Sequence, residues 1–187
     1  MSHPIFTIGH STLSLQDFIE LLRPSAIALV IDVRSIPRSR ANPQFNKDSV
    51  AAALASSQIR YEHIAELGGL RGKQKSLAPS PNGYWRVKSF RNYADYALTR
   101  AFRHGLDRLR AHARARRCVI MCAETLWWRC HRRIITDYLI TAGDEVRHIM
   151  GPKQIAIASL TPGAVVRSGR AIVYPQEKQP APDEQET

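Results

Sequence analysis

Short apolar runs alternate with helix-like segments along most of this 187-residue chain. The runs at 27–33 and 118–122 are almost continuously apolar, which is typical of strands buried on both faces of a parallel sheet. Further strands are expected at 4–9, 59–63 and 145–149. Because strands that alternate with helices form sheets covered by those helices, the pattern predicts a single α/β domain with a mostly parallel sheet flanked by helices.

Helices are expected between these strands. Ser14, with Asp17 three residues later, can cap a helix at 15–23, and Asn46 can cap a helix at 47–57. The apolar stripe of the next long segment predicts one helix at 90–112, and a further helix is expected at 131–141.

The chain changes character after residue 150. We expect the α/β domain to occupy residues 1–150, and a C-terminal extension at 151–174 to pack on it with strands at 155–159 and 165–174. A bend is expected at Ser168-Gly169. Residues 175–187 are rich in Pro, Gln and Glu, a composition typical of a disordered tail.

The chain is strongly basic, with 27 Lys and Arg against 16 Asp and Glu and a formal net charge of +11. A charge of this size favours anionic partners such as nucleotides or nucleic acid. The alternative is that the charge only aids solubility. No run approaches the roughly 20 apolar residues of a membrane span, so no membrane partner is expected. The N-terminus lacks the features of a signal peptide, and three cysteines favour a reducing compartment, so the cytoplasm is the expected location.

The segment 64–89 shows no regular pattern. It mixes basic and aromatic side chains, which would suit a loop that grips a base and a phosphate. An exposed insertion with solvated charges is the alternative.

Polar residues follow the ends of several expected strands. In chain order they are His10, Ser11, Asp32, Arg34, Cys122 and Glu124, with His148 near the end of a later strand. Ligands of parallel sheets bind beyond the carboxyl ends of the strands, so these side chains are predicted to converge on one site.

The densest cluster combines Cys122-Ala123-Glu124 with Cys130-His131-Arg132. At a helix start, Cys130 would have its thiolate favoured by the helix dipole and by neighbouring arginines, as a nucleophile requires; a packing role is the alternative. His10 and His131 are the candidate proton shuttles. Glu124 is a candidate acid or base, or else a partner in a structural ion pair.

A metal site is a further hypothesis, because Cys122, Cys130, His131, His10 and His148 are suitable ligand types. Adjacent residues such as Cys130 and His131 are expected to point in different directions, and no Cys-x-x-Cys pair occurs. We therefore expect no resident metal. No other cofactor is expected, since neither Gly-x-Gly-x-x-Gly nor a P-loop is present.

Guanidinium groups predict an anion pocket. The candidates are Arg34, Arg38, Arg40 and Arg132, and Ser11 and Asp32 would line the same pocket. The alternative for Asp32 and Arg34 is a buried salt bridge.

The same motifs carry a family resemblance. The residues concerned are Thr7–Ser11, Asp32-Val33-Arg34, Pro37, Ser39-Arg40, Phe45, Leu67-Gly68-Gly69, Phe90, Tyr93, Cys122-Ala123-Glu124, Cys130-His131-Arg132 and Val146–Ile149. Over about residues 4–150 the chain resembles the family of domain of unknown function 488. The resemblance implies a Rossmann-like α/β domain and a shared site, with Tyr93 among the residues that bind substrate. It names no substrate.

These observations lead to one main hypothesis and two alternatives. The main hypothesis is an enzyme of the hydrolase or transferase type that acts on a phosphate-bearing substrate, a nucleotide or nucleic acid. The arginines would bind the anion, His10 or His131 with Glu124 would move protons, and Cys130 would attack. The first alternative is a non-catalytic module that binds nucleic acid or senses a ligand, and the second is thiol redox chemistry at Cys122 and Cys130. The oligomeric state is left open.

Overall fold

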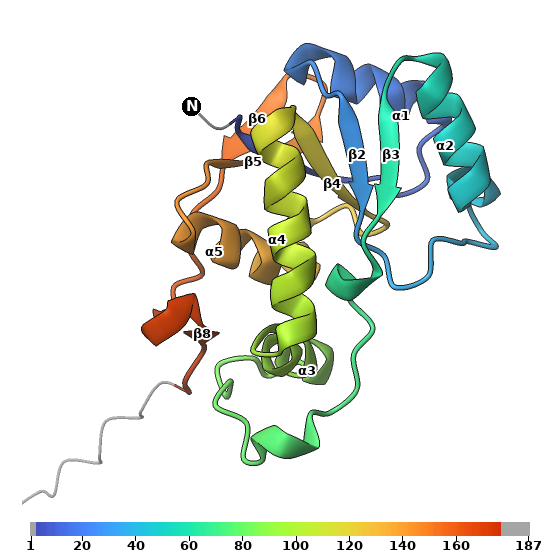
Figure 1. Ribbon diagram of the computed structural model, residues 1–187. Helices are drawn as coiled ribbons and strands as arrows, with labels where there is room; N and C mark the ends of the chain where they lie inside the picture. Colours follow the sequence, from blue (N-terminus) through green and yellow to red (C-terminus); the bar gives the residue numbers. More distant parts are fainter. Residues whose placement is uncertain (1–2, 177–187) are drawn as a thin grey trace, which may run out of the picture.

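The computed structural model describes residues 3–176 (Figure 1). The predicted tail at 175–187 therefore lies almost wholly outside the described residues. The elements are β1 (Ile5–Gly9), α1 (Leu15–Leu22), β2 (Leu29–Asp32), α2 (Lys47–Ser56), β3 (Arg60–His63), α3 (Lys88–Ala97), α4 (Arg100–Ala115), β4 (Cys118–Cys122), α5 (Arg132–Thr141), β5 (Val146–Gly151), β6 (Gln154–Ile157), β7 (Val165–Val166) and β8 (Ile172–Val173). Short 3-10 helices punctuate the loops.

The main sheet has six strands in the order β3-β2-β4-β1-β5-β6. Neighbouring strands from β3 to β5 are parallel, and β6 pairs antiparallel with β5 at the edge. β7 and β8 form a separate antiparallel pair. The predicted α/β fold with a mostly parallel sheet flanked by helices is confirmed.

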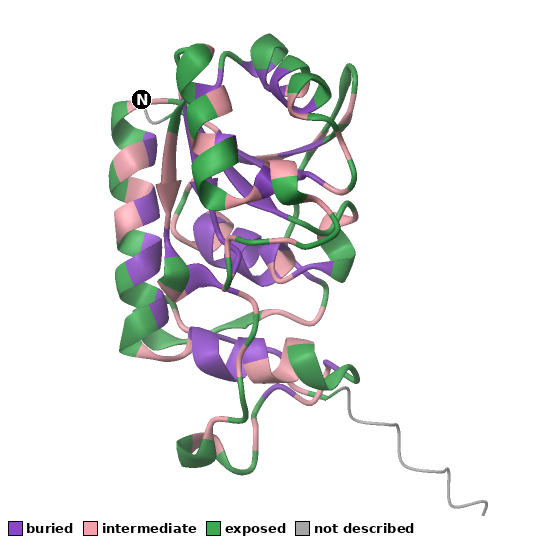
Figure 2. Ribbon diagram, turned by 90° about the vertical axis from the view of Figure 1, so that its right-hand side faces the viewer, coloured by how far each residue is buried: buried purple, intermediate pink, exposed green. Residues whose placement is uncertain are grey.

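Helices cover both faces of the sheet, and the side chains of β4 show the two layers. Cys118, Ile120 and Cys122 belong to the core under α3, α4 and α5. Val119 and Met121 face the opposite way, into the core under α1 and α2. Figure 2 shows buried residues on the inward faces of the helices and exposed residues on their outer faces.

The single helix predicted at 90–112 is wrong, because the structure has two helices there. α3 ends at Ala97, and Thr99 takes an extended conformation in which its hydroxyl accepts a hydrogen bond from the N–H of Phe102 (3.4 Å). Thr99 is thus the N-cap of α4. The apolar stripe continues into α4 and hides this break, because Phe102, Leu106 and Leu109 face the core.

The N-caps predicted for α1 and α2 have different outcomes. The hydroxyl of Ser14 accepts from the N–H of Asp17 (3.0 Å), as expected. Asn46 precedes α2, but its side chain makes no cap; its Oδ1 accepts from the N–H of Ser39 (2.8 Å) and ties down the loop after β2.

The residues after 150 add one strand to the main sheet and the small β7–β8 pair. Beyond this pair, the hydroxyl of the buried Tyr174 donates to the carboxylate of Asp137 in α5 (2.7 Å). Gly169 has φ 68°, which places the predicted bend at the left-handed residue between β7 and β8. Among the described residues, no helix combines the length and the apolar character that a membrane crossing requires.

Candidate functional site

A cavity of about 520 Å³ lies beyond the carboxyl ends of β2 and β4. After β2 the chain enters the α1 and α2 layer, and after β4 it enters the α5 layer, so the two neighbouring strands diverge and leave a crevice. The lining residues are Arg34, Ser35, Ile36, Arg38, Ser39, Gly69, Leu70, Ser89, Phe90, Tyr93, Cys122, Ala123, Glu124, Arg129, Cys130 and His131.

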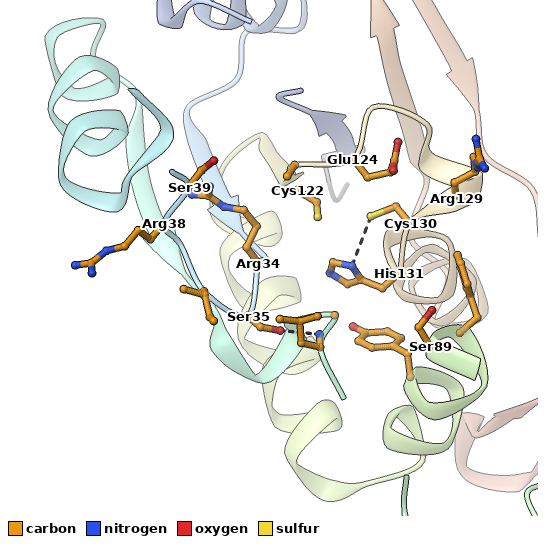
Figure 3. A pocket seen from close by; sticks show the side chains of 16 residues that line it. Arg34, Ser35, Arg38, Ser39, Ser89, Cys122, Glu124, Arg129, Cys130 and His131 are labelled. Atoms are coloured by element: carbon orange, nitrogen blue, oxygen red, sulfur yellow. Dashed lines mark hydrogen bonds between the residues drawn. The ribbon is translucent and has the colours of Figure 1, made fainter. Parts of the chain in front are cut away.

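Two cysteines and a histidine converge on one wall of this cavity. Cys122 ends β4, while Cys130 and His131 come just before α5 (Figure 3). The two sulfur atoms and a ring nitrogen of His131 all lie within 4.8 Å of one another. All three cysteines of the chain are free, and Cys118 lies at the far end of β4.

The ring of His131 is held in one orientation. Its Nε2 is 2.8 Å from the carbonyl oxygen of Val33, and a carbonyl only accepts, so Nε2 carries the hydrogen. This leaves Nδ1 directed at the Sγ of Cys130, 3.5 Å away. The ring of Tyr93 packs edge-on against the imidazole (centroids 5.0 Å apart), and the Tyr93 hydroxyl donates to the carbonyl of Leu67 (2.7 Å).

The surroundings of the two sulfurs shift their pKa values in opposite directions. Burial by itself raises the pKa of the Cys130 thiol, but the hydrogen bond from Cys122 and the contacts with His131 and Arg132 outweigh it and hold this pKa well below its usual value. Cys122 donates to Cys130 and is buried, so its own pKa is well above the usual value. Of the two sulfurs, Cys130 is therefore the one whose surroundings favour the thiolate form.

Arg132 is buried next to Cys130 and holds its sulfur through a hydrogen bond. Its side chain is only 1% exposed, and its Nε donates to the Sγ of Cys130 (3.3 Å). Its NH2 group donates to the carbonyl oxygens of Glu124 and Thr125. The guanidinium therefore ties the end of β4 to the start of α5 and does not line the cavity.

A second polar network adjoins the cavity at the end of β2. Arg34 donates to both carboxylate oxygens of Asp32, with the shortest contact at 2.6 Å, and to the carbonyl of Phe45 (2.8 Å). Tyr61 also donates to Asp32 (2.7 Å). The ring of His10 is fully buried and stacked on Phe45 at 4.0 Å. Desolvation lowers the pKa of His10 to about 4, so this imidazole is neutral at neutral pH.

Glycines allow the close approach of the loops around the cavity. A Cβ added to Gly69 would lie 2.5 Å from Nδ1 of His131, and one added to Gly68 would lie 2.6 Å from Cα of Ser35. Gly9 meets the backbone of Glu124 in the same way, at 2.0 Å. These residues need a bare backbone because another chain segment occupies the space of a side chain.

The chain matches a known protein family. The model of the family described as Domain of unknown function DUF488 matches residues 14–139, about two thirds of the chain. The chain belongs to this family. No curated protein and no solved structure matches it. The matched range contains Cys122, Cys130, His131, Arg132 and the Gly68-Gly69 pair, while β1 with His10 lies outside it.

The predicted residues of this DUF488 protein divide into two groups. Glu124, Cys130, His131, Tyr93 and Arg34 line the cavity. His10, Ser11, Asp32, Arg40 and Arg132 are not part of its lining. Arg40 is exposed, and the N–H of Ser11 donates to the carbonyl of Ala123 (3.0 Å), which helps to join β1 to β4. His148 also lies elsewhere: its ring stacks on Trp127 at 4.1 Å and its Nδ1 contacts the hydroxyl of Thr7 (2.8 Å).

Several cavity residues were not predicted from the sequence. Ser35, Ile36, Ser39, Gly69, Leu70 and Ser89 come from the loops after β2 and β3 and from the start of α3. The sequence did carry a signal for Gly69, because this residue belongs to the Leu67-Gly68-Gly69 motif. Ile36 and Leu70 are 62% and 75% exposed, and exposed apolar residues in irregular loops give no periodic signal.

Proposed function

We propose that this DUF488 protein is an enzyme of the hydrolase or transferase type in which Cys130 is the nucleophile and His131 the proton shuttle. One observation carries the proposal. The Sγ of Cys130 contacts Nδ1 of His131 at 3.5 Å, while the carbonyl of Val33 fixes the other ring nitrogen. A nucleophile, a base and a group that orients the base are the arrangement that covalent catalysis requires.

The surroundings of Cys130 favour the attacking form. The residue directly precedes the cap of α5, so the positive end of the helix dipole stabilises a thiolate there. The guanidinium of Arg132 donates to its sulfur at 3.3 Å. The sulfur is buried but lies in the wall of the cavity, so Arg132 stabilises the negative charge there in place of water.

The reaction that follows from this geometry has two steps. The Cys130 thiol first gives its proton to Nδ1 of His131. The resulting thiolate forms a bond to the electrophilic centre of the substrate, and the bond to the leaving group breaks as that group takes this proton from His131. The oxygen of water in a hydrolase, or of an acceptor molecule in a transferase, then bonds to the same centre as it gives a proton to His131, and the bond to sulfur breaks to release the thiolate.

The proposed substrate is phosphate-bearing, with a nucleotide or nucleic acid as the class that we favour. Arg38 and Arg129 are exposed at the edges of the cavity (Figure 3), and neither makes an ion pair within the described residues. Exposed arginine side chains change rotamer readily, so both guanidinium groups can reach a bound anion. Ile36, Leu70 and Phe90 add an apolar wall that suits a base.

The test is a turnover assay over a panel of nucleotides, phosphomonoesters and phosphodiesters, with reductant and a metal chelator present. We expect Cys130→Ser to abolish turnover and His131→Gln to reduce it about 10²- to 10⁴-fold, the usual contribution of a general acid-base group. Cys118→Ser is the matched control, because Cys118 is buried at the other end of β4, where its thiol donates to the carbonyl of Arg116 (3.3 Å), and it does not line the cavity. Turnover by Cys130→Ser equal to that of Cys118→Ser would disprove the proposal. Binding of panel members without turnover in any form of the protein would support the non-catalytic module instead.

A further inference from the structure

We infer that Cys122, Cys130 and His131 form a binding site for one zinc ion whose open position faces the cavity. The three donor atoms come from two elements, the end of β4 and the start of α5, and they all lie within 4.8 Å of one another. Figure 3 shows the two sulfurs and the imidazole directed toward a common space.

The distances suit a tetrahedral metal ion. With Zn–S near 2.3 Å and Zn–N near 2.0–2.1 Å, tetrahedral angles place a sulfur and a nitrogen ligand about 3.5 Å apart and two sulfurs about 3.8 Å apart. The observed distance from the Sγ of Cys130 to Nδ1 of His131 is 3.5 Å. Cys122 lies within 4.8 Å of both partners, so a small rotation of its side chain completes the set.

The groups that hydrogen-bond to the ligands resemble the outer shell of known metal sites. The carbonyl of Val33 accepts from Nε2 of His131, which leaves Nδ1 free to coordinate. The Nε of Arg132 donates to the Sγ of Cys130, which offsets the charge of a metal-bound thiolate. The ligand Cys130 and its outer-shell partner Arg132 are 4% and 1% exposed, so packing holds both side chains in place.

The donor set selects the kind of ion. Two thiolates and one imidazole suit zinc, whereas magnesium, calcium and manganese prefer oxygen ligands. No fourth Cys, His, Asp or Glu joins the cluster within the part of the chain that the structure describes. Glu124 lines the same cavity, and its carboxylate accepts from the N–H of Leu126 (3.2 Å). Three protein ligands leave one position for a molecule in the cavity, as in zinc sites that exchange ligands.

Zinc binding has a consequence for the proposed function. A zinc ion at this site bonds to the sulfur that would attack the substrate, so the zinc-loaded protein should be inactive as a thiol enzyme. This consequence rests on the proposed function, whereas the binding of zinc does not.

The test is a titration of the full chain with Zn²⁺ in competition with a chromogenic chelator, after the protein has been reduced and freed of metal. We expect one equivalent bound with a dissociation constant below about 1 µM. Cys122→Ser and Cys130→Ser should each weaken binding about 100-fold or more, since even outer-shell partners are worth about 10- to 100-fold. Cys118→Ser keeps the same number of thiols as these two variants and should bind like the wild type.

Two results would overturn the inference. The first is Zn²⁺ affinity that is equal in Cys118→Ser, Cys122→Ser and Cys130→Ser. The second does not depend on the folding of any variant: the wild-type protein with one equivalent of Co²⁺ would lack the near-ultraviolet absorption of a thiolate–cobalt bond. The titration contains no substrate and the turnover assay contains a chelator, so failure of the zinc site and failure of the proposed enzyme are separate outcomes.

Discussion

The side chains of Cys130 and His131, although adjacent in sequence, face each other with Sγ and Nδ1 3.5 Å apart. The backbone explains this contact. Cys130 is extended (φ −127°, ψ 149°), whereas His131 already has helical angles (φ −57°, ψ −17°) as the cap of α5. Side chains of neighbours alternate within a strand, but a change from extended to helical backbone between them turns both toward the cavity. The expectation that these two residues point apart does not hold, and it was one of the two arguments against a metal.

Gly69→Ala should displace His131, because the added Cβ would fall 2.5 Å from Nδ1. Relieving this overlap has to move either the loop after β3 or the imidazole, at a cost of about 1–3 kcal/mol in the free energy of unfolding. The alkylation rate of Cys130 and the urea unfolding curve report the two effects. Gly72→Ala is the control in the same loop, since nothing lies within 4 Å of a Cβ at that position. Equal behaviour of the two variants would show that Gly69 does not constrain His131.

Acid should destabilise the protein through two buried histidines. Desolvation lowers the pKa values of His10 and His148 to about 4, against 6.5 in the unfolded chain. Their stabilising contribution is therefore complete above about pH 6.5 and is lost as the pH falls toward 4, because only the unfolded chain takes up the protons in that window. The expected loss is on the order of 2 kcal/mol per histidine at pH 5.

Urea unfolding between pH 7.5 and 4.5 measures this slope. His148→Gln removes one of the two groups, so the slope should become shallower even though the variant is less stable at neutral pH. A slope unchanged by His148→Gln would contradict the assignment of that histidine as a neutral buried group.

The sequence predicted the layout of the fold but not the direction of the polar side chains. The apolar runs at 27–33 and 118–122 exist because both faces of a central strand are buried, and that requirement is visible in composition alone. The direction in which a guanidinium after such a strand points depends on which carbonyl or carboxylate is nearest in space. Arg34 bonds Asp32 and Phe45, and Arg132 bonds the backbone at Glu124, and these partners are set by packing between distant segments.

The helix break at Thr99 could not be predicted for a related reason. Both α3 and α4 pack apolar faces on the same core, so the hydrophobic pattern carries no sign of where one helix ends. Threonine is a common N-cap, but it also occurs within helices, and only its extended backbone in the structure distinguishes the two cases.

Asp32→Asn should be strongly destabilising. It leaves the guanidinium of Arg34, which is 6% exposed, without its charged partner in the interior. Removal of one partner of a buried pair costs about 3–5 kcal/mol, because the other charge stays desolvated. Arg23→Ala is the control, since it removes an ion pair with Glu20 whose side chains are 61% and 52% exposed, and it should cost less than about 1 kcal/mol. Unfolding free energies that are lowered equally by the two substitutions would refute the structural role of the Asp32–Arg34 pair.

Arg129→Gln and Arg38→Gln should weaken the binding of anions while leaving the protein as stable as the wild type. Both side chains are exposed at the edges of the cavity, so they contribute little to folding but add a charged hydrogen-bond donor to a bound phosphate. Each substitution should raise the dissociation constant of a nucleoside monophosphate about tenfold, measured by isothermal titration at low salt. Arg40→Gln is the matched control, because Arg40 is exposed on the same loop as Arg38 but does not line the cavity. A loss of affinity as large in Arg40→Gln as in the other two variants would assign the effect to the overall positive charge of the protein rather than to this cavity.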